Sequence, residues 1–289
     1  MTCTGTVTTR HWRHHAIPPA TGKPIGLIIT ADDFGLDTAV NDAVEQAHTR
    51  GVLNATSLMV SAPAAEDAIA RAKRLPTLAV GLHLVLTDGR ATLPPPKIPD
   101  LVRSDGRFGG HMARNGVRFF CLPHVRRQLA AEIRAQFEAF AATGLKLDHV
   151  NVHKHFHVHP TVLSLVMSVG REFGMRAVRL PAEPGMAWWL APWVDLMRVR
   201  LDRAGLVHND HIFGIAATGA MDEQALLKAL DQLPGGLTEI YSHPATRRGL
   251  TPTMRDYRHT DELAALLSPR VRDAIGELGL VPGGFSMLA

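Results

Sequence analysis

The sequence predicts an α/β fold, a distorted (β/α) barrel with about seven mostly parallel strands in a single domain. Short apolar runs alternate with amphipathic segments along the chain, which is typical of a parallel sheet covered by helices. Chemically active residues stand at the carboxyl ends of several runs, for example Asp32, His83 and His243. Parallel barrels carry their function at that end of the strands. The length of 289 residues, 46% of them hydrophobic, suffices for one large core.

The predicted strands are short runs of branched and apolar residues, which indicates burial on both faces of a sheet. They cover residues 25–30, 54–60, 78–84, 147–152, 176–180, 212–216 and 237–242. Helices are predicted where apolar residues recur three or four positions apart. They cover a segment that Asp37 would cap and Gly51 would end, and then residues 63–75, 123–143, 160–173, 192–203, 221–233 and 260–278.

Two stretches of the chain lack this alternation. Residues 1–24 contain polar residues, histidines and prolines without an apolar central segment, so we expect a mobile tail and not a signal peptide. The folded domain is then expected over residues 25–289. Within it, residues 87–121 contain three consecutive prolines, several glycines and little periodicity. A long irregular stretch in a compact domain is usually a lid or a binding loop, and we predict that role here.

Composition excludes several classes of function. The net charge of +4 is mild, and no basic run carries interleaved aromatic residues, which argues against nucleic-acid binding. Cys3 and Cys121 make no C-x-x-C motif and suit a reducing compartment. No apolar run approaches the roughly 18–20 residues that span a bilayer. We therefore expect a cytoplasmic protein, with peripheral contact at the inner membrane as the alternative and with the oligomeric state open.

Four histidines stand two residues apart in the segment from Asn151 to Pro160. Side chains alternate between the faces of a strand, so His153, His155, His157 and His159 would share one face for as long as the chain stays extended. Idle imidazoles are costly to bury, and neutral imidazole is the commonest metal ligand. The row is a candidate metal site, with a surface histidine loop or a satisfied hydrogen-bond cluster as the alternative.

Asp32 and Asp33 are adjacent carboxylates at the end of a run that is predicted to be buried. They repel each other and lose hydration there, so a cation would compensate them. The alternative is an ordinary aspartate-rich turn that leads into a helix. His83 ends another apolar run, where a lone histidine is more often a satisfied core residue than a ligand.

One carboxylate and two imidazoles form a site for a divalent metal, with zinc first and Fe, Co, Ni, Mn or Mg as the other candidates. Three protein ligands leave positions open, which is the arrangement of a catalytic metal. Adjacent aspartates permit a division of roles. Asp33 would bind the metal, whereas Asp32 would take a proton from the attacking water, and His243 would protonate the leaving group.

Four motifs together resemble one family of enzymes. They are residues 30–35 (Thr-Ala-Asp-Asp-Phe-Gly), residues 81–84 (Gly-Leu-His-Leu), the His-x-His-x-His run and residues 241–244 (Tyr-Ser-His-Pro). In this order, over about residues 25–245, they resemble the YdjC-type carbohydrate deacetylases. The resemblance implies a distorted α/β barrel that binds a divalent metal and removes N-acetyl groups from sugars such as chitooligosaccharides.

Carried over by motif, the resemblance implies that Asp33, His83 and His153 are the metal ligands. It implies that Asp32 is the base and His243 the acid, and that His155 and His157 lie behind the ligands or face the substrate.

At one position the sequence departs from the family. Most relatives have an aspartate two residues before the first histidine of the run, whereas this chain has Asn151. The change removes a charge beside the ligands and is expected to alter their orientation or the metal affinity. The form Asn-x-His-Lys-His-Phe-His resembles the hopanoid-biosynthesis branch, which implies deacetylation of an N-acetylglucosaminyl hopanoid lipid.

Residues 186–203 contain three of the four tryptophans. Helical spacing from Pro192 onward predicts either a helix that faces the core or an apolar surface for a lipid substrate or a membrane interface. Trp189 and Trp193 are the candidate contacts, because an indole ring has an apolar body and one N–H donor.

Three further functions stay open from the sequence alone. The first is a deacetylase of soluble chitooligosaccharides. The second is an Fe(II) oxygenase, in which two histidines and one carboxylate bind iron, although the paired aspartates and His243 would then have no role. The third is a metal-binding protein without catalytic activity.

Overall fold

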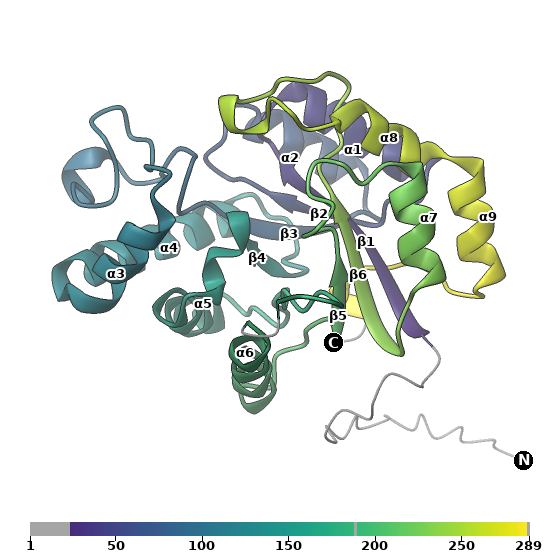
Figure 1. The fold of residues 1–289 in the computed structure, drawn as a ribbon. Helices are drawn as coiled ribbons and strands as arrows, with labels where there is room; N and C mark the ends of the chain where they lie inside the picture. The colour runs from purple at the N-terminus through teal and green to yellow at the C-terminus, as the bar shows by residue number, and fades with distance from the viewer. Residues whose placement is uncertain (1–23, 188–189, 288–289) are drawn as a thin grey trace, which may run out of the picture.

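Six parallel strands form one curled sheet at the centre of the molecule (Figure 1). The computed structural model describes residues 24–187 and 190–287. The strand order is β4-β3-β2-β1-β6-β5. The strands are β1 (Pro24–Phe34), β2 (Ala55–Leu58), β3 (Ala79–Leu84), β4 (Val150–Val152), β5 (His211–Phe213) and β6 (Gly236–Ser242). Helices separate the strands that follow one another in the chain, as parallel pairing requires.

The described helices surround the sheet as one domain. They are α1 (Thr38–Arg50), α2 (Ala65–Arg74), α3 (Met112–Cys121), α4 (Pro123–Ala142), α5 (Pro160–Glu172), α6 (Ala191–Arg203), α7 (Glu223–Asp231), α8 (His259–Leu267) and α9 (Pro269–Glu277). Four 3₁₀ segments add to them: η1 (Pro95–Lys97), η2 (His153–Val158), η3 (Pro252–Met254) and η4 (Phe285–Met287). Figure 1 shows α1, α2 and α8 above the sheet and α5 and α6 below it. None of the described helices is both long and apolar enough to cross a membrane.

β1 is the longest strand and lies between β2 and β6. Its side chains Leu27, Ile28 and Ile29 are all buried, as the continuous apolar run predicts for a strand covered on both faces. The strand extends beyond Thr30, where the sequence predicts its end, and includes both aspartates. β1 therefore delivers Asp32 and Asp33 to the carboxyl edge of the sheet.

The sheet has six strands where the sequence predicts seven, because residues 176–180 form no strand. Val178 makes an isolated parallel bridge with Val150, and Ala177 makes one with Val207. At Leu180 both backbone groups bond to the side chain of Asn209 instead of a neighbouring strand. The residue that follows is Pro181, which has no N–H to donate to a ladder.

The predicted helix over residues 260–278 is two helices, α8 and α9. Ser268 separates them, and its hydroxyl accepts a hydrogen bond from the backbone N–H of Val271. Pro269 occupies the first position of α9, where its missing N–H costs nothing. The apolar spacing continues across this break and therefore predicted a single helix.

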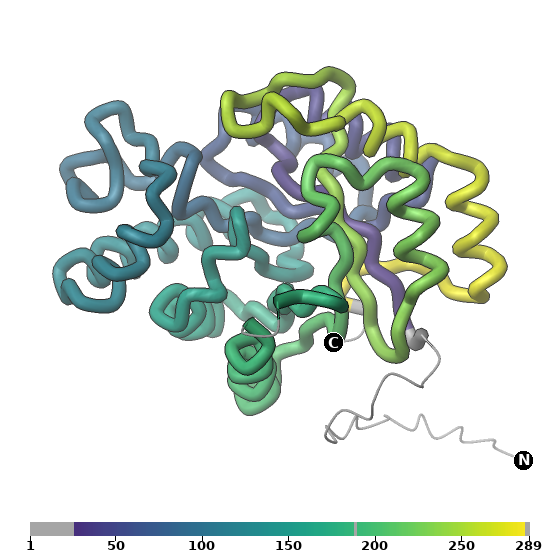
Figure 2. Tube along the Cα trace, in the orientation of Figure 1, coloured from purple at the N-terminus to yellow at the C-terminus, as the bar shows by residue number. Residues whose placement is uncertain are grey.

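Residues 87–121 are less irregular than their composition indicates. They contain η1, the helix α3, and two antiparallel bridges, Arg90 with Arg107 and Val102 with Phe108. Figure 2 shows this segment as the blue tube that projects at the left of the molecule. The helical part escaped prediction because α3 has few buried side chains to give it a pattern.

Candidate active site

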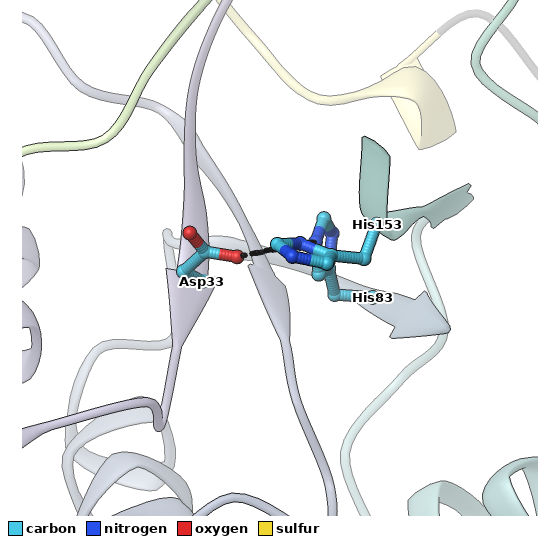
Figure 3. Close-up of side chains that lie close together, drawn as sticks. All are labelled: Asp33, His83 and His153. Atoms are coloured by element: carbon cyan, nitrogen blue, oxygen red, sulfur yellow. Dashed lines mark hydrogen bonds and ion pairs between the residues drawn. The ribbon is translucent and has the colours of Figure 1, made fainter. Parts of the chain in front are cut away.

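The side chains of Asp33, His83 and His153 converge at the carboxyl edge of the sheet (Figure 3). Asp33 Oδ1 lies 3.2 Å from His83 Nε2 and 3.3 Å from His153 Nδ1. The two ring nitrogens are 3.1 Å apart. Asp33 and His83 lie at the ends of β1 and β3, and His153 is the residue after β4. The three ligand candidates are therefore held by three strands that lie far apart in the sequence.

This group has the properties of a site for a divalent cation. All three side chains are buried, and one donor atom from each lies within 4.8 Å of the others. Neither oxygen of Asp33 accepts a hydrogen bond from a described residue, although a buried carboxylate without a partner is costly. Burial would raise the pKa of Asp33, but His153 and His83 beside it hold that pKa well below its usual value. An anionic oxygen and two imidazoles suit zinc and its neighbours.

The backbone at the end of β1 turns both aspartates toward the site. Strict alternation would send Asp32 and Asp33 to opposite faces of the strand. The register between β1 and β2 shifts between Ala31 and Phe34, which marks a bulge. Within it Asp33 has a φ of 65°, in the left-handed region that aspartate tolerates better than most residues. Such a conformation is costly and is typical of functional positions.

The four histidines do not share one face, contrary to the prediction from their spacing. Extension ends at Val152, and the next residues form η2. Lys154 and His155 inside η2 have φ values of 55° and 52°, so the chain turns sharply there. Only His153 reaches the metal group. The sequence gives no sign of two consecutive left-handed residues when neither is a glycine. The spacing of the histidines alone therefore predicted an extended chain where the chain turns.

His155 and His157 form their hydrogen bonds outside the metal group. His155 Nε2 is 3.0 Å from the hydroxyl of Tyr241. His157 Nε2 donates to the backbone oxygen of Arg179 over 2.8 Å. Burial lowers the pKa of both rings, to about 4 for His157, so both are neutral hydrogen-bonding groups at pH 7.

Asn151 connects a ligand candidate with the second aspartate. Its Oδ1 lies 2.7 Å from His83 Nδ1, and its Nδ2 donates to Asp32 Oδ1 over 2.9 Å. The hydroxyl of Ser57 also donates to Asp32 Oδ1 and lies 3.0 Å from His83 Nδ1. This network assigns the proton of His83 to Nδ1 and leaves Nε2 free to bind a metal.

Arg179 joins Asp32 to a second buried carboxylate, Glu239. Its guanidinium donates to both oxygens of each carboxylate. All three side chains are at most 2–3% exposed. Thr30 also donates to Glu239, over 2.7 Å, and the guanidinium carbon lies 4.7 Å from the centre of the Tyr241 ring. A planar, bidentate donor suits two carboxylates better than a lysine would.

This contact controls the charge of Asp32. Burial alone would raise the pKa of Asp32, but Arg179 and then His83 lower it far below the usual value. Asp32 is therefore ionised at neutral pH. It accepts hydrogen bonds from Arg179, Ser57 and Asn151, which fixes its carboxylate in one orientation.

His243 follows β6, and its ring is buried beside those of Tyr241 and Tyr257. No described residue bonds its Nδ1. Burial lowers the pKa of His243, and the carboxylates of Asp33 and Asp32 oppose that shift only in part. The backbone of His243 is held on both sides: its N–H donates to Glu262 over 2.6 Å, and His259 Nδ1 lies 2.6 Å from its carbonyl oxygen.

Glu262 positions this loop and was not predicted from the sequence. Its carboxylate accepts from the backbone N–H groups of His243 and Met221. Burial raises the pKa of Glu262 to about 7, and these two hydrogen bonds oppose the shift. The glutamate lies on an ordinary amphipathic helix, α8, and no spacing distinguishes it from a surface residue.

Two cavities flank the segment η2. One has a volume of about 420 Å³ and includes His153 in its wall, together with Asp88, Arg90 and Arg107 from the stretch 87–121. The other has a volume of about 550 Å³ and is almost wholly apolar. Its lining is Met112, Ala113, Gly116, Val117, Phe120, Cys121, Phe156, Val158, His159, Pro160 and Trp193. The cavity at the metal group, whose walls are partly polar, therefore has an almost wholly apolar neighbour.

Trp193 lies at the rim of the apolar cavity and is 37% exposed. Its indole N–H donates to the backbone oxygen of Val158 in η2. The buried face of α6 consists of Val194, Met197 and Leu201, so the helix packs on the core without this tryptophan. Trp189, the other predicted contact, lies outside the described residues.

A model of the YdjC-like protein family matches residues 26–277. The chain belongs to this family. It is similar to a carbohydrate deacetylase of Brevibacillus brevis, with 31% identity over 256 residues that cover 86% of this chain and 94% of the relative. A carbohydrate deacetylase of Geobacillus stearothermophilus is also 31% identical, over 258 residues that cover 88% and 94% of the two chains.

Among solved structures, the fold is similar to an Enterococcus faecalis protein described as a cellobiose-phosphate cleavage protein. The TM-score is 0.75 at 25% identity, and the match covers 93% of this chain and 100% of the other. An uncharacterised protein of Agrobacterium tumefaciens matches with a TM-score of 0.50 at 12% identity, over 94% and 92% of the chains. This second likeness concerns the fold alone.

Replacement of Arg179 should destabilise the fold strongly. Arg179→Met leaves Asp32 and Glu239 buried without a counter-charge, and breaking such a group costs about 3–5 kcal/mol. Arg134→Met is the matched control, because its partner Glu172 is exposed and an exposed ion pair contributes little to stability. Urea unfolding at pH 7 measures both. Equal stability of the two variants would contradict the role of Arg179.

Asn151 should affect metal affinity without binding the metal. Asn151→Ala removes the acceptor that holds His83 Nδ1, and loss of such a partner weakens metal binding by about 10–100-fold. Asn54→Ala is the control, because the Oδ1 atom of Asn54 has no hydrogen-bond partner among the described residues. Titration calorimetry with Zn²⁺ should give a weaker Kd for Asn151→Ala alone. An unchanged Kd would show that Ser57 suffices to orient His83.

Proposed function

We propose that this chain is a metal-dependent carbohydrate N-deacetylase, an amide hydrolase that removes the acetyl group from an N-acetylglucosamine unit. The observation that carries the proposal is the buried group of Asp33, His83 and His153 beside a second, separately held carboxylate, Asp32. A metal-storage site needs no such second carboxylate. The names of the relatives, which are carbohydrate deacetylases, support the same reaction.

Asp33, His83 and His153 would hold one divalent ion, for which the donor set favours zinc, with Mg, Mn, Co, Ni and Fe as alternatives. When bound, such an ion polarises the acetyl carbonyl and lowers the pKa of water toward about 7. Three protein ligands leave room for water and substrate.

Asp32 accepts the proton of the water that attacks the acetyl carbonyl. Arg179, Ser57 and Asn151 hold its carboxylate in place, so the base needs no reorientation during the reaction. Because Arg179 holds the pKa of Asp32 low, Asp32 releases this proton again, and His243 delivers a proton to the leaving nitrogen.

His243 donates a proton to that nitrogen as the C–N bond breaks, which yields acetate and a free amine. Glu262 and His259 fix its backbone, and Tyr241 and Tyr257 flank its ring. A proton donor at this point is needed, because an amide nitrogen leaves poorly without one.

We infer further that the sugar is carried on a hopanoid glycolipid, and that the reaction converts N-acetylglucosaminyl bacteriohopanetetrol to the glucosaminyl form. The likeness of the Asn-x-His-Lys-His-Phe-His run to the hopanoid branch supports this substrate. The apolar cavity supports it too, because Phe156 in its wall stands three residues after His153. The volume of this cavity lies within the range of roughly 300–1,000 Å³ that is typical of small-molecule binding sites. A soluble chitooligosaccharide remains the alternative substrate.

Replacing each of the two aspartates by asparagine in a separate variant should distinguish an enzyme from a metal carrier. Asp33→Asn tolerates the left-handed backbone but removes the anionic ligand, so bound metal and activity should fall together. Asp32→Asn should keep the metal and lower kcat by roughly 10²–10⁴-fold. Elemental analysis and acetate release measure the two effects. Full activity of Asp32→Asn would exclude the proposed mechanism and favour a carrier.

His243→Ala should resemble Asp32→Asn, with normal metal content and a kcat lower by roughly 10²–10⁴-fold. His124→Ala, an exposed histidine of α4, is the control and should keep wild-type kcat. A normal kcat for His243→Ala would remove this residue from the mechanism.

Acetate release from N-acetylglucosaminyl hopanoid and from chitobiose, measured side by side, should identify the substrate. Trp193→Ala removes an apolar wall of the cavity worth roughly 25 cal/mol per Å² of buried surface. We expect it to raise KM for the glycolipid and to leave KM for chitobiose within a factor of about two. Equal losses on both substrates would assign Trp193 a structural role and favour the soluble substrate.

A further inference from the structure

Exposed apolar side chains gather on two helices beside the apolar cavity. Seven large hydrophobic residues are exposed in the described part of the chain, and five of them lie on α3 and α6. We name these five the α3–α6 surface: Val117, Phe120, Trp193, Leu196 and Val199. Single exposed apolar residues are ordinary, but a contiguous group marks an interaction site.

The two helices share one opening. Val117 and Phe120 of α3 and Trp193 of α6 line the same cavity, although more than 70 residues separate them in the sequence. Leu196 and Val199 continue the surface along α6 and are 48% and 41% exposed. No described segment covers these side chains. Val117, Phe120 and Trp193 therefore border one cavity, and Leu196 and Val199 follow Trp193 on the same helix.

Positive charge accompanies this surface. Residues 111–127 contain four arginines and no acidic residue. Arg118 is paired with Asp100 over 3.0 Å, which leaves Arg114, Arg126 and Arg127 without an acidic partner among the described residues. All three are exposed. The guanidinium of Arg126 donates to the carbonyl oxygens of Phe119 and Phe120, so its charge lies at the end of α3 next to the exposed phenylalanine.

α6 adds to this charge more weakly. It carries three arginines, Arg198, Arg200 and Arg203, and two aspartates, Asp195 and Asp202, so its formal charge is +1. Arg200 donates to the hydroxyl of Ser164, a neutral partner. Arg198 is paired with Asp210 over 3.9 Å, so the excess of positive charge beside the apolar rim comes mainly from residues 111–127.

We propose that the α3–α6 surface docks on an anionic lipid bilayer. Phenylalanine, leucine and tryptophan beside arginine are the composition of surfaces that lie at a membrane interface, with the apolar side chains below the headgroups. Tryptophan suits this boundary because its ring is apolar and its N–H is polar. Charge decides between the two most plausible occupants: a second copy of this chain would bring its own arginines against these, whereas anionic lipid complements them.

Docking in this orientation would bring a lipid substrate to the metal group. This step of the inference rests on the proposed function, whereas the bilayer contact does not. The cavity between the helices opens at the bilayer surface, and its inner wall is η2, whose first residue is the ligand candidate His153. An amphiphile could move from the bilayer into the cavity with its sugar toward the metal group. The bilayer contact itself requires no catalysis and is testable alone.

Vesicle sedimentation tests the contact directly. Wild-type protein should bind vesicles of phosphatidylcholine mixed with phosphatidylglycerol and should bind pure phosphatidylcholine much less. Leu196→Ser with Val199→Ser should weaken binding by roughly tenfold or more, because two apolar side chains no longer insert. Leu278→Ser with Val281→Ser, the two exposed apolar residues elsewhere on the described chain, is the matched control and should bind as wild type.

Charge is tested separately. Arg114→Gln and Arg127→Gln should each weaken binding to the anionic vesicles by about fivefold, and added salt should weaken wild-type binding. Failure of the wild type to bind anionic vesicles would overturn the proposal. A stable dimer in analytical ultracentrifugation that the Leu196→Ser, Val199→Ser pair disrupts, without vesicle binding, would overturn it in favour of a second copy.

Acetate release from chitobiose separates this inference from the proposed function. The Leu196→Ser, Val199→Ser protein should keep wild-type kcat and KM on this soluble sugar, because neither side chain lines either of the two cavities beside η2 or belongs to the metal group. Vesicle binding by a protein that deacetylates no sugar would refute the deacetylase and leave the bilayer contact standing. Activity on chitobiose without vesicle binding would refute the bilayer contact and leave the deacetylase standing.

Discussion

Burial of two adjacent carboxylates at the end of β1 is the constraint on which the rest of the site depends. Each must be compensated, and the structure compensates them differently. Asp32 receives the guanidinium of Arg179, whereas both oxygens of Asp33 remain without a hydrogen bond from the described residues. The bulge and the left-handed backbone of Asp33 separate the two environments. One carboxylate is thereby fixed as an internal anion and the other is left for a cation.

The alternation of apolar runs and helical spacing predicted the α/β class and nearly every element, because burial on both faces of a parallel strand leaves a continuous apolar signal. Failures occurred where side chains replaced backbone partners. Asn209 takes the ladder bonds of Leu180, and Ser268 with Pro269 divides the last helix. Both are ordinary residues in sequence, and only the three-dimensional neighbours show what they bond.

The site residues that belong to recognisable motifs were predictable from the sequence. The charged residues that hold them in place were not. Asp33, His83 and His153 were predicted from motif and resemblance, and the structure brings them together. Arg179 and Glu262 were missed, because one charged residue in an apolar run or on an amphipathic helix resembles a surface residue. Their importance follows from burial alone: an arginine with no exposed surface must have carboxylate partners.

Charge balance gives a physical reason for an asparagine at position 151, where the resemblance leads us to expect an aspartate. Asp32, Asp33 and Glu239 contribute −3, and Arg179 contributes +1, so a divalent ion beside Asp33 would bring the formal charge of the group to zero. An aspartate at position 151 would make it −1 and would face the carboxylate of Asp32 at the 2.9 Å that an amide donor now spans. The amide keeps the orienting acceptor for His83 without that repulsion. The neutral amide between His83 and Asp32 thus avoids a further negative charge in this buried group.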